Sequence, residues 1–219
     1  MTNLPRQILI FLALGALGAT QIVDVLYLVV RSPGTSEAPP ASRQEASDDA
    51  LARTSLETLG GCYAVRYEFT EDGRGDFFLE DGVESMDVTR VGDGYLVRDF
   101  LVNEEYRFLH WTQEWTPLAS GRWLLTVRSG DGALRYQSEG VWRFNQWEGG
   151  AAPAHKPVRD ELRTDYDHIV RRNVMQFTAD RWVHSEINLK VREDATPVAS
   201  EVGWITYVRR DSDELCGVR

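Results

Sequence analysis

Residues 182–191 read WVHSEINLKV, and this stretch decides the fold class. Its apolar and polar residues alternate, so two sets of side chains point in opposite directions when the chain is extended. One set is Val183, Ile187, Leu189 and Val191, and the other is His184, Glu186, Asn188 and Lys190. An alternation of this length predicts a β-strand with two chemically different faces.

The same period recurs through most of the chain after residue 60. It is found in residues 62–70 (CYAVRYEFT), 94–102, 106–115 (YRFLHWTQEW), 122–129, 135–144 and 203–210. Turn signals lie between the runs at residues 71–73, 92–94, 130–132 and 148–150 (Glu-Gly-Gly). Eight or more short strands joined by hairpins predict a mainly β fold, an antiparallel barrel or a strongly curved sheet. One helical candidate, Val158 to Arg172, could equally be extended.

The N-terminal region is different. Residues 8–30 form a run of apolar side chains with one charge, Asp24, and about 20 apolar residues are enough to span a bilayer. We interpret residues 1–31 as a single transmembrane α-helix, with a cleaved signal peptide ending near residue 20 as the alternative. The small residues Gly15 and Ala19 predict contact with a partner helix. Asp24 either joins that contact or lies at the outer interface, where it reaches water.

A linker and one folded domain are expected after this segment. Residues 32–50 are rich in Pro, Ser and acidic side chains, which is typical of a linker, and residues 51–219 form the predicted domain. A short helix is expected from Ala50 to Leu59, capped by Asp48 or Asp49. Arg6 and the α-amino group before the apolar run favour a cytoplasmic N-terminus, so we predict an inner-membrane protein with a periplasmic domain.

Composition excludes several function classes. The 219 residues include 24 Lys+Arg and 34 Asp+Glu, a net charge of −10, which is wrong for a nucleic-acid binder. An aromatic content of 11% is too high for a disordered chain. Two cysteines are too few for a Cys₄ zinc site, and the four histidines form no metal-binding pair, so no metal site is predicted. We find no nucleophile motif or dinucleotide fingerprint, so no catalytic residue is assigned.

An ordered set of short motifs resembles the uncharacterised bacterial family DUF6607. These motifs are residues 61–65 (GCYAV), 110–115 (HWTQEW), 159–166 (RDELRTDY), 170–173 (VRRN), 182–184 (WVH) and 213–216 (DELC). The resemblance implies a secreted or periplasmic domain with a calycin-like barrel, the group that includes lipocalins and phycobilin lyases. The family has no established activity, so the resemblance implies a fold and a compartment rather than a reaction.

Cys62 and Cys216 match cysteines of that family, and we place them in the first and last strands of the domain. An oxidising compartment would let them form a disulfide. First and last strands are neighbours in a closed barrel, which agrees with this pairing. The alternative is a pair of buried free thiols in a cytoplasmic domain.

A ligand site is predicted from aromatic and basic residues. Trp111, Gln113 and Trp115 project from one face of one strand, and they either line a cavity or belong to the core. With Arg143, Tyr166 and Arg172 at its mouth, such a cavity would suit an apolar molecule with an anionic group, such as a fatty acid or a tetrapyrrole. The polar residues of 165–173 are alternatively a clamp that holds a long connection. His110 and His184 are expected to make structural hydrogen bonds.

Three functions follow from these observations. The first is a non-enzymatic accessory protein that docks on a larger membrane complex, such as a photosynthetic or respiratory assembly, through its anchor. The alternatives are a carrier of a hydrophobic or tetrapyrrole-like ligand, and an enzyme similar to the bilin lyases, for which the basis is fold alone. No cofactor is predicted beyond a bound hydrophobic ligand.

Overall fold

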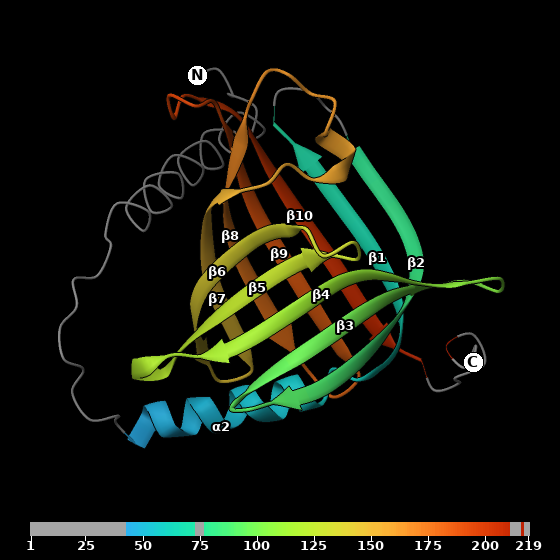
Figure 1. The fold of residues 1–219 in the computed structure, drawn as a ribbon, viewed down its shortest axis with the longest axis vertical. Coiled ribbons are helices and arrows are strands. Elements are labelled where there is room, and N and C mark those ends of the chain that lie inside the picture. Colours follow the sequence, from blue (N-terminus) through green and yellow to red (C-terminus); the bar gives the residue numbers. More distant parts are fainter. Residues whose placement is uncertain (1–42, 73–76, 211–215, 217–219) are drawn as a thin grey trace, which may run out of the picture. The chain divides into compact units, whose positions relative to one another are not determined.

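Ten antiparallel strands close into a barrel in the computed structural model of the chain (Figure 1). Each strand pairs with its neighbour in sequence, and β1 pairs with β10 to close the ring. The structure describes residues 43–72, 77–210 and 216. The strands are β1 (Gly61–Glu71), β2 (Phe77–Val91), β3 (Gly94–Val102), β4 (Arg107–Pro117), β5 (Arg122–Ser129), β6 (Leu134–Arg143), β7 (Gln146–Ala154), β8 (His168–Phe177), β9 (Arg181–Val191) and β10 (Pro197–Arg209). This confirms the mainly β fold and decides for the barrel over the open curved sheet.

The predictions for the N-terminal region fall outside this description. The apolar segment with Gly15, Ala19 and Asp24, and the linker up to residue 42, lie among residues that the structure does not describe. Within the described ranges, no helix combines the length and the apolar character needed to cross a membrane. The anchor, the linker and the periplasmic location therefore remain predictions.

The α-helix α2 (Arg43–Glu57) precedes the barrel and lies across one of its ends (Figure 1). It begins at Arg43 rather than Ala50, so Asp48 and Asp49 lie inside the helix instead of capping it. The carboxylate of Asp49 accepts a hydrogen bond from Arg53 Nε at 2.8 Å, one turn along the helix. The helix buries Ala52 and Leu56, which lie four residues apart on one face.

Aromatic side chains fill the barrel beneath α2. Rings from six strands form a continuous series of contacts, which ends with the stack of Trp182 on Tyr207 at a centroid distance of 3.8 Å. The ring contacts that lead to this stack join Trp147, Trp115, Trp142, Phe177 and Trp182. Rings of this size bury the largest apolar area per residue, so this end of the barrel is a packed core. We call it the aromatic half.

The turn predicted at residues 148–150 does not form, and the packing of Gly149 and Gly140 gives the reason. Gly149 and Gly150 were expected in a turn, but they lie inside β7, where Gly149 is opposite Gly140 of β6. A Cβ atom on Gly149 would lie 2.5 Å from the Trp147 indole, and one on Gly140 would lie 2.7 Å from it. Gly140 and Gly149 therefore make room for the buried Trp147 ring. The turn between β6 and β7 is at residues 144–145 instead.

A disulfide joins Cys62 at the start of β1 to Cys216, with 5.8 Å between the Cα atoms. Cys216 lies beyond the end of β10 rather than in the last strand as predicted. Arg209 adds polar contacts at the same place, donating hydrogen bonds to the carbonyl of Gly60 and to the hydroxyl of Tyr63. The two ends of the barrel sequence are thus fastened together beside the pair of strands that closes the ring.

Strand β9, which contains the alternating stretch 182–191, has its polar face inside the barrel. His184, Glu186, Asn188 and Lys190 of β9 are buried, whereas Val183 and Ile187 are only partly buried. The alternation is as predicted as far as Asn188, and from there to Val191 every residue is buried. A barrel interior normally takes the apolar set, so the inverted arrangement marks a specialised region.

Candidate functional site

A cavity of about 430 Å³ lies in the half of the barrel away from α2. Its apolar lining includes Phe69, Phe78, Leu101, Val127, Met175 and Ile205. This volume is in the range of small-molecule sites, which are mostly apolar with a few polar groups at defined positions. The cavity is the candidate site.

A β-bulge brings an unexpected histidine to the cavity. Asp99 of β3 pairs with Trp111 of β4 and the next residue, Phe100, pairs with Leu109, so β4 carries one extra residue, His110. Because the bulge interrupts the alternation, His110 and Trp111 both line the cavity, with their ring centroids 4.4 Å apart. His110 was expected to make a structural hydrogen bond, but its Nδ1 is buried and has no hydrogen-bond partner in the described part of the chain.

Four cationic side chains also line the cavity, against two acidic ones. The cations are Arg135, Lys156, Arg159 and Arg171, and the acids are Glu80 and Glu186. The chain as a whole carries −10, so this balance is opposite in sign to that of the protein. A cavity of this kind attracts an anionic group.

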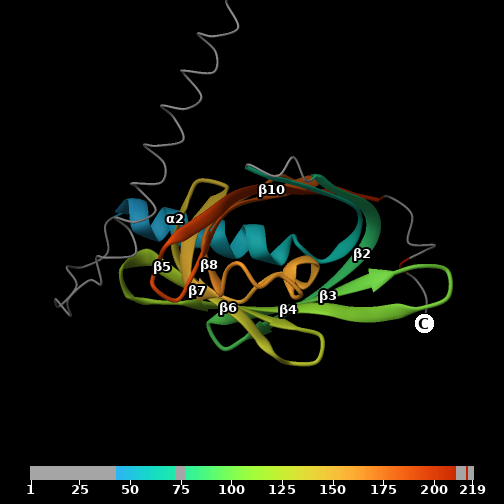
Figure 2. The ribbon, with the colours of Figure 1, turned by 90° about the horizontal axis from the view of Figure 1, so that it is seen from above.

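The segment between β7 and β8, residues 155–167, lies across this end of the barrel, and we call it the strap (Figure 2). It contains a short 3₁₀ turn at Val158–Asp160, and His168 onward is strand, so the candidate helix over 158–172 does not form. His155, Lys156, Pro157 and Arg159 of the strap line the cavity. The strap therefore covers the site and contributes side chains to it.

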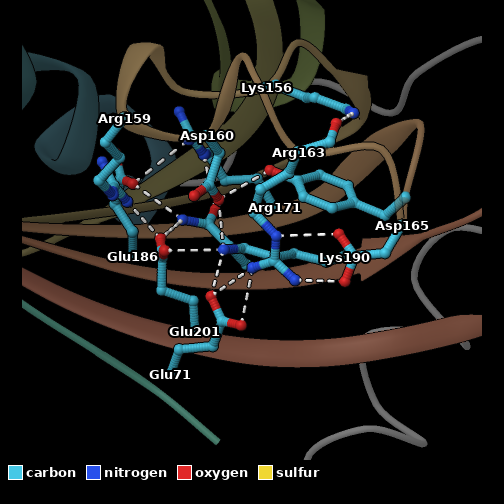
Figure 3. A network of polar contacts seen from close by, with 12 residues as sticks. Glu71, Lys156, Arg159, Asp160, Arg163, Asp165, Arg171, Glu186, Lys190 and Glu201 are labelled. Carbon is cyan, nitrogen blue, oxygen red and sulfur yellow. Dashed lines mark hydrogen bonds and ion pairs between the residues drawn. The ribbon is translucent and has the colours of Figure 1, made fainter. Parts of the chain in front are cut away.

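Ion pairs fasten the strap to three strands (Figure 3). Asp160 pairs with Lys190 of β9, Arg159 with Glu201 of β10, and Arg163 with Glu71 of β1 at 2.8 Å. Tyr166 is buried and donates its hydroxyl hydrogen to Asp160 Oδ2 at 2.8 Å. A clamp on a long connection is thus present, but of the residues predicted for it only Tyr166 and Asp165 take part, and Asp160, Arg163, Lys190 and Glu201 form the rest.

Lys190 is the centre of this cluster. Its side chain is 0% exposed, and its ammonium pairs with Asp160, with Glu71 and, at 3.2 Å, with Glu201. Burial is the largest single influence and works against the charge, but the carboxylates of Asp160, Glu71 and Glu201 together outweigh it, so the pKa of Lys190 is raised. Oxygen atoms of the three carboxylates lie within 4.8 Å of one another, the spacing of a cation site, and the Lys190 ammonium is the cation that they surround.

Below Lys190, polar groups continue along the inner faces of β8 and β9. Arg171 donates to Asn188 Oδ1 at 2.8 Å and approaches Glu186 Oε2 at 3.3 Å. Burial is the largest single influence and opposes ionisation of Glu186, but Arg171 and its other polar neighbours together outweigh it and lower its pKa. His184 Nε2 is 3.0 Å from Asn173 Oδ1, and burial lowers the pKa of His184 to about 4. These contacts fix the orientation of Arg171 at the cavity wall.

A carboxyl pair lies behind the wall formed by His110. Glu84 of β2 and Asp99 of β3 are both 0% exposed. Glu84 accepts a hydrogen bond from the hydroxyl of Tyr67, and its Oε1 is 3.5 Å from His110 Nδ1. Burial raises the pKa of Glu84 to about 7 and that of Asp99 further above its usual range, with the Glu84 charge adding to the second shift. Two buried carboxyl groups side by side hold at least one proton at neutral pH.

The structure divides the predicted ligand residues. Trp111 and Gln113 line the cavity, but Trp115 belongs to the aromatic half, where its indole Nε1 donates to Gln113 Oε1 at 3.3 Å. The other three do not line the cavity. Arg143 is at the exposed end of β6, Tyr166 is buried in the clamp, and Arg172 faces outward and pairs with Glu148.

Sequence reasoning missed the residues that distinguish the site. Arg171 rather than Arg172 points inward, and strand alternation relative to the buried Ile169 could have found it. Lys190 and Glu186 were on the correct face of their strand, but nothing in the sequence marked that face as internal. His110 depends on the bulge, for which the sequence has no signal that we could identify.

Comparison with models of protein families and with curated protein sequences finds no match. Among solved structures, the chain is similar to the S-type phycobiliprotein lyase CPES of Guillardia theta. The two are 12% identical, with a TM-score of 0.48, and the likeness covers 78% of this chain and 99% of that one. The closed barrel and its cavity are established by the strand pairing and the side chains described above, independently of this likeness.

Proposed function

We propose that the protein binds a small amphipathic acid in the barrel cavity and acts as its carrier. The observation that carries this proposal is a cavity with apolar walls and four cationic side chains in a chain of net charge −10. The apolar part of the ligand would lie against side chains such as Phe69, Leu101 and Ile205. An anionic group would lie near the strap, where the cations gather.

The cations differ in how far they are already neutralised. Arg159 and Arg171 pair with the buried carboxylates of Glu201 and Glu186. Lys156 instead donates to the carbonyl of Arg163 at 2.7 Å and lies over the Tyr166 ring, and no carboxylate pairs with it among the described residues. Arg135 contacts the strap at the Lys156 carbonyl, and Glu161 is 3.7 Å away. Lys156 and Arg135 are therefore the expected partners of the anionic group.

The test is a binding titration of the full-length chain with dodecanoate and with its methyl ester, followed by tryptophan fluorescence because Trp111 lines the cavity. Dodecanoate should bind more tightly. Lys156→Gln and Arg135→Gln should each weaken its binding by about tenfold, the scale of a charged hydrogen bond. Arg172→Gln, which alters an arginine on the outer face, is the matched control. Absence of binding, or equal binding of acid and ester by every variant, would refute the carrier.

The accessory role on a membrane complex remains a separate proposal, supported by the apolar segment with Gly15, Ala19 and Asp24. Native electrophoresis after gentle detergent extraction tests it, since a chain that migrates only as a monomer contradicts it. Membership of DUF6607 and an activity similar to that of bilin lyases also remain predictions. A carrier can be anchored, so the carrier and accessory proposals are tested independently.

A further inference from the structure

The wall of the cavity at His110 is backed by carboxyl groups, whereas the strap side of the cavity carries cations. His110 lines the cavity, and behind it lie Glu84 and Asp99, both fully buried. The two carboxyl groups share a side-chain hydrogen bond and hold at least one proton between them.

The carboxyl pair determines which nitrogen of His110 holds the hydrogen. Nδ1 makes no hydrogen bond to the described residues, but it is 3.5 Å from Glu84 Oε1, and the negative charge of that carboxylate favours the hydrogen of a neutral ring on Nδ1. Nε2 is then left with a free lone pair. Burial lowers the pKa of His110, which favours this neutral form, although the Asp99 and Glu80 charges oppose it.

The titratable groups next to His110 are tyrosines and carboxyl groups, and none of these is a cation. Tyr67 and Tyr207 line the cavity next to this wall, and Tyr67 donates to Glu84. Tyr207 is fully buried, and burial, with the Glu84 and Asp99 charges, keeps its pKa well above the usual range, so it stays neutral. The acidic groups that face His110 are Glu84, Asp99 and Glu80. His110 lines the cavity, and an acceptor nitrogen on this wall is satisfied by a ligand that brings a donor, so the site favours such a ligand.

We propose that His110 is an acceptor subsite of the cavity, and that the bound molecule presents an O–H or N–H group to its Nε2 in addition to an anionic group elsewhere. This inference rests on the proposed function, because it specifies the ligand of the same cavity. It narrows the ligand class from any amphipathic acid to one that also carries a hydroxyl or a nitrogen-bound hydrogen.

Two matched probes test the subsite on the full-length chain. One is an octanoate whose chain ends in a phenol, and the other is the same molecule with the phenol oxygen methylated. Both carry the carboxylate and nearly the same apolar body, but only the first can donate a hydrogen bond to His110. The phenol should bind about tenfold more tightly than the methyl ether, which corresponds to one hydrogen bond gained and one buried acceptor satisfied.

Variants assign the preference to His110. His110→Phe keeps a ring at the cavity wall and should bind the two probes equally. Glu84→Met removes the acceptor that faces Nδ1, so Nδ1 is no longer the favoured position of the ring hydrogen and the preference for the phenol should fall. His168→Gln, at a histidine outside the cavity, should retain it. If both probes bind the native chain equally, or if His110→Phe keeps the preference for the phenol, the proposal of an acceptor subsite at His110 is wrong. The proposal that the protein is a carrier is unaffected by that result. If neither probe binds, the carrier proposal fails and the subsite fails with it.

Discussion

The two halves of this barrel are built from different chemistry on the same ten strands. Beneath α2 the interior is a chain of aromatic rings, from Trp147 through Trp115 to Tyr207. Beneath the strap it holds a buried lysine, several carboxylates and a cavity. The aromatic half is stabilised by apolar burial and shape, whereas the half beneath the strap depends on charges that must all find partners. The comparison indicates that the first half maintains the fold and the second half holds the site.

The largest effect should come from removing the central cation beneath the strap. Lys190→Met leaves Glu71, Asp160 and Glu201 buried without their shared ammonium, and the free energy of unfolding should fall by about 3–5 kcal/mol. Urea denaturation of the full-length chain at neutral pH measures the loss. Lys156→Met, at the other lysine of the chain, is the control and should change stability little. A Lys190→Met protein as stable as the native one would show that this half does not depend on charge pairing.

A comparable loss is expected in the aromatic half, for a different reason. Trp115→Ala removes a fully buried ring that contacts Trp142 and Trp147, and should cost about 3–5 kcal/mol with no dependence on pH. Trp204, which is 43% exposed, provides the matched control, and Trp204→Ala should have a much smaller effect. Equal losses for the two variants would mean that ring packing does not stabilise this half.

Removing the disulfide should separate stability from binding. The double variant Cys62→Ser, Cys216→Ser frees the ends of a barrel sequence that the bridge now joins, and we expect a loss of about 2–4 kcal/mol. The bridge is at the end of the barrel near α2, so affinity for dodecanoate should be unchanged below the unfolding transition. A parallel loss of binding in the folded variant would show that the two halves are coupled.

The smallest effect is a pH dependence that originates in the Glu84–Asp99 pair. A free glutamate has a pKa of about 4.3, whereas Glu84 in the fold has a pKa of about 7. Between these values the folded chain holds a proton that the unfolded chain has lost. This contribution to stability is therefore present at low pH and is lost as the pH rises to 7, by up to about 1.4 kcal/mol per pH unit.

Glu84→Gln should remove this slope, which unfolding free energies measured from pH 5 to 7 can detect. His184 acts in the opposite direction, because its pKa is lowered to about 4 in the fold, and its contribution is lost as the pH falls from about 6.5. The difference between the curves of the native chain and the variant is the informative quantity, since His184 contributes equally to both. Parallel curves would mean that Glu84 titrates normally.

The sequence predicted the barrel because strand alternation and turn residues are local signals. Residues 94–102 and 122–129 were predicted with the bounds that the structure gives to β3 and β5. The start of α2 was missed because its first turns carry few apolar residues, so nothing distinguished them from linker. Gly149 and Gly150 of β7 resembled a turn because nothing in the sequence showed that Gly149, like Gly140 on the neighbouring strand, leaves space for the Trp147 ring.

The site was harder to predict than the fold. Trp111 and Gln113 were found because an aromatic strand face is visible in the sequence. Tyr166 and Arg172 were assigned to the mouth because their polar cluster is prominent, yet one is sealed in the clamp and the other faces outward. Lys190 and Glu186 appear as ordinary surface residues of an amphipathic strand, since their burial is offset by partners that are 30 or 15 positions away in the chain. Pairing at that separation is a property of the fold and not of any short motif.

The disulfide also makes residues 62–216 a covalent ring. A protease cut in a hairpin turn, such as the one at residues 130–132, would open this ring without dividing the molecule. The nicked protein would migrate as one species on a non-reducing gel and as two fragments after reduction. Because the bridge lies beside the contact between β1 and β10, the fragments would still be joined where the sheet closes. New chain ends could for the same reason be placed in that turn, with the natural ends of the barrel sequence connected through sulfur.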